Sequence, residues 1–165
     1  MGELQVQVLM GSASDADVMA NTVRTLREFG ISCGMTVASA HRSPDRVQSV
    51  LKEALGRGVE VFVVGAGAAA HLAGVVAAHT VRPVIGVPID SSPLGGFDAL
   101  LSTVQMPPGV PVATVAVGKA GATNAAVLAA QILAVSDSEI RSRLEDYRRV
   151  LVEKVEQAAA TLAQP

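Results

Sequence analysis

The segment Ser39-Ala40-His41-Arg42-Ser43-Pro44 brings together side chains that can bind an anion and transfer a proton. A histidine side chain can give and take a proton, so His41 is a candidate for proton transfer, and Arg42 carries a planar cation that suits a phosphate or a carboxylate. Ser43 followed by Pro44 is typical of a helix start, whose unpaired N–H groups also favour an anion. The segment therefore predicts an anion site with a proton-transfer group beside it, although an ordinary exposed turn would have the same composition.

A second turn, over residues 11–15, carries hydroxyls and a carboxylate. Ser12 and Ser14 suit a phosphate, whereas Asp15 would accept hydrogen bonds from a ribose diol and repel a phosphate. Simple helix capping by Ser14 explains this turn about equally well.

A third turn, over residues 65–71, has almost no side chains before His71. Its backbone can therefore approach a flat ring or a small carboxylate closely, since glycine removes steric bulk. His71 is either a pocket residue or, as its surroundings slightly favour, a partly buried helix histidine. His79 is predicted to lie on the surface.

Short apolar segments alternating with helical patterns must position these turns. The predicted strands cover residues 4–10, 32–38, 59–64, 83–87 and 111–117, and the predicted helices cover residues 14–29, 43–55, 69–79, 97–104 and 121–134. The strands are apolar along most of their length rather than regularly alternating, which indicates a parallel sheet with helices on both faces. The three turns then follow the first three strands, at the sheet edge where such folds bind ligands.

Several boundaries are predicted from single residues. Ser14 with Asp17, and Ser136 with Glu139, have the spacing of a capping box, with Asp replacing Glu in the first pair. Pro88 is predicted to end the fourth strand, since proline cannot donate a hydrogen bond to a neighbouring strand.

A long final helix is predicted from about 137 to 162, roughly 40 Å in length. Its apolar stripe consists of Ile140, Leu144, Tyr147, Leu151, Val155, Ala158 and Leu162. Packing on its own domain and packing on a neighbouring subunit are equally compatible with this stripe. Residues 1–165 are predicted to form a single domain, because no linker or low-complexity tract interrupts the pattern.

Composition argues against several classes of partner. The formal net charge of −2 gives no electrostatic signature of nucleic acid or anionic membrane binding. A single cysteine, Cys33, and no recognisable secretion signal predict a cytoplasmic protein.

The chain is 50% hydrophobic but only 2% aromatic, with a mean hydropathy of +0.41, so part of its surface is expected to be buried between subunits. Residues 61–78 are apolar, but their glycines favour a strand, turn and helix over a membrane span.

Familiar catalytic motifs do not account for the turns. Residues 118–121 resemble the end of a phosphate-binding loop but lack its upstream glycine and its following serine or threonine. The glycines at 65–70 do not complete a dinucleotide fingerprint. The sequence has no cluster of cysteine and histidine with metal-ligand spacing, so it predicts no metal site. It also has no nucleophile elbow around a serine.

The sequence closely resembles the class I PurE family, the 5-(carboxyamino)imidazole ribonucleotide mutases of purine (IMP) biosynthesis. The matching segments are MGSASD (10–15), SAHRSP (39–44), GAGAAAHLAG (65–74), GVP (86–88), VQMPPGVPVATVAVGKAGATNAA (104–126) and LAAQILA (128–134). Two positions depart from the pattern: family members often have glycine where this chain has Ala68, and proline where it has Ala73.

The resemblance implies a three-layer flavodoxin-like α/β fold with a central parallel sheet and a long C-terminal helix, assembled into homo-octamers. It implies an isomerase that needs no cofactor and converts 5-(carboxyamino)imidazole ribonucleotide to 4-carboxy-5-aminoimidazole ribonucleotide. A carboxyl group would leave the exocyclic nitrogen as carbon dioxide, stay in the pocket and add to a ring carbon. A carboxylase that uses free carbon dioxide and a non-catalytic module that binds a phosphorylated ligand are the alternatives.

The resemblance also assigns residues. His41 matches the catalytic histidine, which moves a proton between the nitrogen and the ring carbon. The remaining matches form the predicted substrate-binding set: Ser12, Ser14 and Arg42 at the phosphate, Asp15 at the ribose, Gly67, Ala68, His71 and Leu72 near the travelling carboxylate, and Ser39 and Ala40 in the segment that holds His41.

Overall fold

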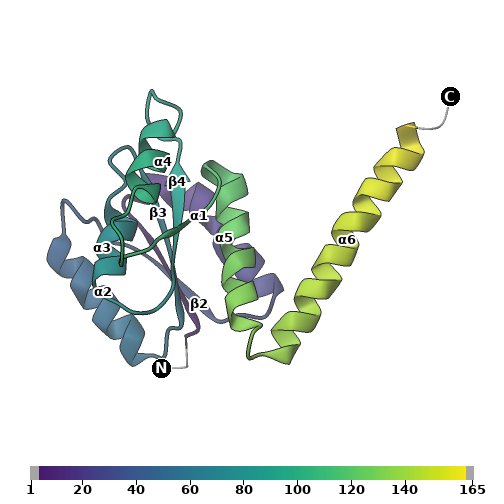
Figure 1. Ribbon diagram of the computed structural model, residues 1–165, viewed down its shortest axis with the longest axis horizontal. Helices are drawn as coiled ribbons and strands as arrows, with labels where there is room; N and C mark the ends of the chain where they lie inside the picture. The colour runs from purple at the N-terminus through teal and green to yellow at the C-terminus, as the bar shows by residue number, and fades with distance from the viewer. Residues whose placement is uncertain (1–3, 163–165) are drawn as a thin grey trace.

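Five parallel strands form the central sheet in the computed structural model, which describes residues 4–162 (Figure 1). The strands are β1 (Val6–Met10), β2 (Cys33–Val37), β3 (Val61–Gly67), β4 (Val84–Ile89) and β5 (Ala113–Thr114). Their order is β2-β1-β3-β4-β5, so the chain first adds β2 on one side of β1 and then continues on the other side. The predicted parallel sheet is confirmed, although β5 is much shorter than the predicted segment.

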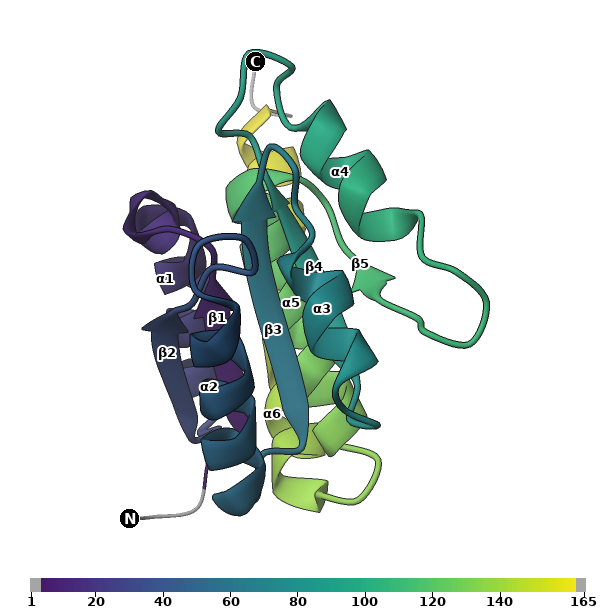
Figure 2. The same ribbon diagram turned by 90° about the vertical axis from the view of Figure 1, so that its left-hand side faces the viewer.

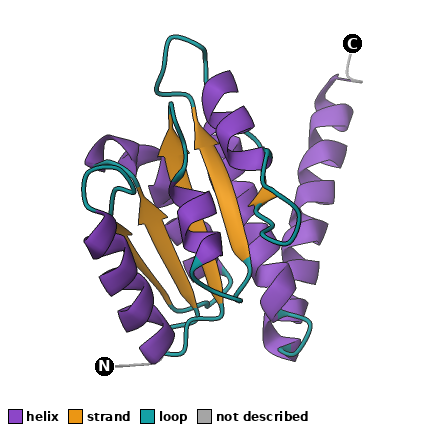
Figure 3. Ribbon diagram, turned by 60° about the vertical axis from the view of Figure 1, so that its left-hand side comes forward, coloured by secondary structure: helices purple, strands orange, loops and turns teal. Residues whose placement is uncertain are grey.

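Helices cover both faces of this sheet, as Figures 2 and 3 show. On one face lie α1 (Ala16–Glu28) and α5 (Gly118–Leu133), and on the other lie α2 (Pro44–Gly56), α3 (Leu72–Ala78) and α4 (Phe97–Val104). Along β1, Val8 belongs to the hydrophobic core between the sheet and helices α1 and α5, and Leu9 belongs to the core on the opposite face, under α2, α3 and α4. The central strands β1, β3 and β4 are therefore buried on both sides, which explains their largely apolar sequences, whereas β2 at the edge of the sheet is only partly buried. The layered arrangement confirms the flavodoxin-like architecture.

Small residues allow the layers to approach one another closely. The buried face of α5 is built from Gly121, Ala122, Ala125 and further alanines, and Thr22 of α1 donates a hydrogen bond to the Ala122 carbonyl at 2.8 Å. At Gly65, an added Cβ atom would lie 2.3 Å from the sulfur of Met19. Such close contacts explain how a core with few aromatic rings can be densely packed.

The final helix, α6 (Ser138–Leu162), packs on the domain only along its first half. Ile140 is buried, and Tyr147 meets Phe29 edge-to-face with 5.3 Å between the ring centres. Arg143 donates a hydrogen bond to the Phe29 carbonyl at 2.7 Å. From residue 148 to residue 162 every side chain is exposed, and the helix projects away from the sheet (Figure 1). Packing on its own domain therefore holds for the first half of the helix only.

Two predicted capping boxes are wrong. Ser14 lies inside a short 3₁₀ helix, Ala13–Asp15, where its backbone N–H donates to the Ser12 hydroxyl, and α1 then begins without a side-chain cap. At α6 the cap is Asp137 rather than Ser136, because the Asp137 carboxylate accepts from the N–H groups of Glu139 and Ile140 at 2.9 and 3.1 Å.

Pro88 lies within β4 rather than ending it. It pairs in register with Ala66 of β3, whereas β5 pairs only with Ile85 and Gly86. Pro88 therefore has no strand partner on its β5 side, where the missing N–H costs no sheet hydrogen bond. Among residues 4–162, no helix is both long enough and apolar enough to span a membrane.

Candidate functional site

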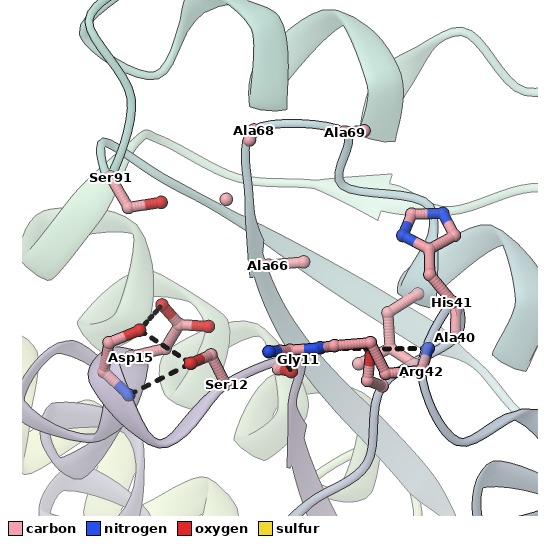
Figure 4. Close-up of a pocket in the computed structure, with 14 residues that line it drawn as sticks. Gly11, Ser12, Asp15, Ala40, His41, Arg42, Ala66, Ala68, Ala69 and Ser91 are labelled. Atoms are coloured by element: carbon pink, nitrogen blue, oxygen red, sulfur yellow. Dashed lines mark hydrogen bonds between the residues drawn. The ribbon is translucent and has the colours of Figure 1, made fainter.

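A cavity of about 430 Å³ lies where four strands end, beside the point at which the strand order reverses (Figure 4). This is the position at which open parallel sheets bind ligands. Every predicted site residue except His71 lines it. The lining residues are Gly11, Ser12, Ser14, Asp15, Ser39, Ala40, His41, Arg42, Ala66, Gly67, Ala68, Ala69, Leu72 and Ser91.

The turn after β1 forms one end of the cavity. The Ser14 hydroxyl lies 2.8 Å from the Ser12 hydroxyl and 3.4 Å from a carboxylate oxygen of Asp15. Asp15 is only 4% exposed. Burial raises the pKa of Asp15, while hydrogen bonds from Ser12 and Ser14 and the charge of Arg42 oppose the rise. This end therefore combines two hydroxyls with a carboxylate that is poorly solvated.

Arg42 connects the turns after β1 and β2. Its Nη2 donates to the Gly11 carbonyl at 2.8 Å, and its Nε donates to the Ser39 hydroxyl at 3.3 Å. These bonds hold the guanidinium against the cavity, near the hydroxyls of the first turn (Figure 4).

Ser43 stabilises the second turn instead of capping α2 through its side chain, which corrects the sequence prediction. Its hydroxyl accepts from the Ser39 N–H at 3.1 Å and lies 3.3 Å from the Ser39 carbonyl. Because the hydroxyl is engaged with Ser39, it makes no capping bond to α2. Pro44 does occupy the first turn of the helix, as predicted.

The turn after β3 forms a wall of backbone and methyl groups. An added Cβ atom at Gly67 would lie 1.8 Å from the Ser91 hydroxyl and 3.2 Å from the Ile89 carbonyl. Ala68 has a φ of +50°, a left-handed conformation that favours glycine. A side chain at Gly67 would therefore displace the Ser91 hydroxyl and crowd the Ile89 carbonyl, and Ala68 is held in a strained conformation beside it.

His41 and His71 contact each other at the opposite end of the site. Nε2 of His41 lies 2.8 Å from Nδ1 of His71, and the rings are nearly perpendicular, at 89°. His71 is exposed and immediately precedes α3, because this helix begins at Leu72 rather than at residue 69. The prediction of a partly buried helix histidine is therefore wrong. His79 is exposed, as predicted.

Four lining residues were absent from the sequence prediction: Gly11, Ala66, Ala69 and Ser91. The first three lie within the turns already singled out but offer only backbone or a methyl group. Ser91 follows β4, whose predicted end at residue 87 placed this serine too far from the edge of the sheet. Because the fourth strand of a parallel sheet ends at the same edge as the other three, the residues after it could have been included in the predicted site.

The arrangement combines several chemical capabilities. Hydroxyls and a guanidinium can bind a phosphate, a carboxylate can bind a diol, and an imidazole can give and take a proton. Within residues 4–162, no three histidine, cysteine, aspartate or glutamate residues are grouped so that they could hold a metal ion.

Several known proteins are similar to this chain over most of its length. A family model described as AIR carboxylase matches residues 5–154. Proteins named N5-carboxyaminoimidazole ribonucleotide mutase from Pyrococcus horikoshii and Escherichia coli K12 are 50% and 47% identical to this chain. The first alignment covers 95% of this chain and 88% of the relative, and the second covers 92% and 89%.

A solved structure gives the same result for the fold. The crystal structure of Treponema denticola PurE superposes with a TM-score of 0.88 at 31% identity, covering 98% of this chain and all of that one. The resemblance found in the sequence is thereby confirmed. Because the family model matches nearly the whole chain and the relatives are about half identical to it, this chain belongs to the AIR carboxylase family.

Proposed function

We propose that this chain is an isomerase of purine biosynthesis that converts 5-(carboxyamino)imidazole ribonucleotide to 4-carboxy-5-aminoimidazole ribonucleotide. The observation that carries this proposal is the division of the cavity. Groups suited to a phosphoribosyl moiety, around Asp15 and Arg42, lie at one end, and His41 lies at the other (Figure 4). The relatives that are about half identical to this chain bear the name of the same mutase.

Substrate anchoring is assigned to the first two turns. Arg42, Ser12 and Ser14 bind the phosphate, since a guanidinium has several N–H donors and its bonds to Gly11 and Ser39 use only part of them. Asp15 accepts hydrogen bonds from the ribose hydroxyls. Anchoring far from the reacting atoms orients the imidazole ring against His41 and the backbone wall.

The proton transfer is assigned to His41. When the N–C bond to the carboxyl group breaks, carbon dioxide leaves and the exocyclic nitrogen keeps the electron pair, to which His41 gives a proton. The ring carbon then bonds to carbon dioxide and returns a proton to His41, so the histidine ends in its starting state. A histidine side chain can serve both steps because an imidazole donates a proton in its charged form and accepts one in its neutral form.

The wall formed by Gly67, Ala68 and Leu72 is assigned to the travelling carboxyl group. Leu72 is buried, and the turn presents backbone and methyl groups rather than water-binding side chains. Such a surface retains carbon dioxide beside the ring and keeps competing water away.

The first test is the variant His41→Asn, with His79→Asn as its matched control. His41→Asn should lose about 10²-fold or more in turnover, the usual scale for a general acid–base group, while still binding the substrate. His79 is exposed and lies outside the cavity, so its replacement should leave turnover unchanged. Near-normal turnover in His41→Asn would refute the proposed mechanism.

The second test separates the mutase from a carboxylase, the activity in the description of the family model. The carboxyamino ribonucleotide is incubated with and without labelled bicarbonate. Conversion without uptake of label supports the mutase, whereas dependence on added bicarbonate supports the carboxylase. Binding without conversion in either case would indicate a module that only binds a phosphorylated ligand.

Assembly into a homo-octamer is proposed for the same protein. Phe97, Leu101 and Val104 form an exposed apolar face on α4, and Leu151 and Val155 continue an exposed stripe on the projecting half of α6. Apolar faces of this kind are typical of subunit interfaces. We further assign residues 1–165 to one domain, since the first half of α6 packs on the core; a single cooperative unfolding transition would support this assignment.

A cytoplasmic location is also proposed. The proposed substrate is a charged ribonucleotide, which does not cross a bilayer unaided. The single cysteine, Cys33, is a free thiol, as is typical of a reducing compartment. Cell fractionation should recover the activity with cytoplasmic markers.

A further inference from the structure

We infer that His71 is a positioning residue that holds the His41 ring with Nε2 engaged and Nδ1 directed to the substrate. The inference rests on the proposed role of His41 as the group that moves the proton. It starts from the 2.8 Å separation between Nε2 of His41 and Nδ1 of His71, which is hydrogen-bond distance. His71 does not line the cavity, so it acts on the ligand through His41.

A hydrogen bond between two imidazole nitrogens needs one proton between them, and the reaction decides which ring supplies it. When Nε2–H of His41 donates to Nδ1 of His71, the neutral His41 ring has an unprotonated Nδ1. That Nδ1 can accept the substrate proton, and the charged ring that results still donates through Nε2. The contact therefore persists in both charge states of His41.

The reverse arrangement does not persist. If Nδ1–H of His71 donated to Nε2 of His41, protonation of His41 at Nε2 would set two N–H groups against each other. Protonation at Nδ1 is also blocked, because the neutral ring would already carry its proton there. The contact would have to break in every catalytic cycle, so we assign the donor to His41 and place the proton of neutral His71 on Nε2.

The backbone that supports His71 is well fixed. Its N–H donates to the Ala69 carbonyl at 2.8 Å, and its own carbonyl accepts from Val75 in the first turn of α3 at 3.0 Å. The next residue, Leu72, is buried. The His71 ring meets His41 at 89°, so it restrains the orientation of the second ring as well as its tautomer.

Two other charged or titratable side chains line the cavity with His41. Arg42 is the neighbouring residue, with its guanidinium engaged by Gly11 and Ser39, and Asp15 lies at the far end (Figure 4). Within the part of the chain that the structure describes, neither side chain makes a hydrogen bond to His41. His71 is therefore the side chain whose loss should change the tautomer of His41.

The experiment compares His71→Ala with His71→Asn, whose amide oxygen can accept a hydrogen bond near the original position of Nδ1. His71→Ala should lower kcat by about 10²-fold, the scale of a misplaced catalytic group, with KM changed by less than about 3-fold. His71→Asn should restore most of kcat. The pH profile of kcat should shift in His71→Ala and return toward the wild-type profile in His71→Asn.

A second readout does not depend on turnover. In protein with ¹⁵N-labelled histidine, the nitrogen shifts of neutral His41 should report a proton on Nε2 in the wild type and in His71→Asn. In His71→Ala they should report a mixture of tautomers. Should His71→Ala fail to fold, the wild-type and His71→Asn spectra still decide whether Nε2 carries the proton.

Two results would overturn the inference: a proton on Nδ1 of neutral His41 in the wild type, or wild-type kcat with an unchanged His41 tautomer in folded His71→Ala. These results differ from failure of the proposed function, which would appear as near-normal turnover in His41→Asn.

Discussion

Replacement of Ala68 by glycine should stabilise the protein, although it removes a methyl group from the wall of the cavity. Within residues 4–162, Ala68 is the non-glycine residue with a positive φ, at +50°. A left-handed conformation costs an L-residue roughly 1–2 kcal/mol. Glycine would remove this strain but lose roughly 0.4–1 kcal/mol through the greater freedom of the unfolded chain. The free energy of unfolding should therefore rise by roughly 0.5–1 kcal/mol, the difference between these two effects.

Ala69→Gly is the matched control, because Ala69 is also exposed and lines the same turn but lacks a positive φ. That variant should be destabilised by roughly 0.4–1 kcal/mol, since only the cost in the unfolded state applies. At this chain length 1 kcal/mol corresponds to about 2–4 °C in Tm, so Ala68→Gly should raise Tm by about 1–4 °C.

The assay is thermal unfolding followed by circular dichroism, without ligand and at one fixed protein concentration, since association changes Tm. A lower Tm for Ala68→Gly, or equal shifts of the same sign in both variants, would show that Ala68 stores no strain. The reasoning from its φ would then be wrong.

Further predictions concern binding, pH and assembly. Arg42→Ala should raise the Kd for a phosphorylated ligand by on the order of 10-fold to 10²-fold, the scale of a lost charged hydrogen bond, while leaving the Kd of the matching nucleoside unchanged in calorimetry. Burial raises the pKa of Asp15 above its ordinary value of 3.8, so the carboxyl group binds a proton more tightly in the folded state than in the unfolded state. The free energy of unfolding should therefore fall as pH rises from 3.8 to the raised pKa of the folded state. Asp15→Asn should therefore increase Tm most at pH 7, with a gain that shrinks as pH is lowered toward 3.8; a gain independent of pH would contradict this origin. Truncation after Tyr147 keeps the packed half of α6 and should yield smaller particles in light scattering, whereas particles of unchanged size would exclude the projecting half from assembly.

Hydrophobic patterning predicted most of the fold because its signal is local. A strand buried on both faces is apolar at most positions, as in the segment 61–64, and this pattern can be recognised without knowledge of the neighbouring elements. Once the strands were known to be parallel, the turns after them had to meet at one edge. Residues 11–15 and 39–42 could therefore be assigned to a single site before their distances were known.

Cap identities were less predictable, because adjacent polar groups compete for the same N–H donors. Ser136 and Asp137 both precede α6, and only the three-dimensional path of the chain decided that Asp137 accepts the bonds. In the same way, Ser43 had two possible partners, the start of α2 and Ser39, and the fold selected Ser39.

The sequence by itself determined the layered α/β class, the family and the turns that carry the chemistry, because residue types and spacing along the chain encode all three. The tertiary structure decided how separate turns meet. His71 is 30 positions from His41 in the sequence. The two residues make contact because the turns after β2 and β3 converge, although β1 lies between these strands in the sheet. Ser91 reaches Gly67 for a similar reason, through the pairing of β3 with β4. Contacts between distant residues depend on strand order and on where each helix starts, and neither of these can be predicted from a single stretch of the sequence.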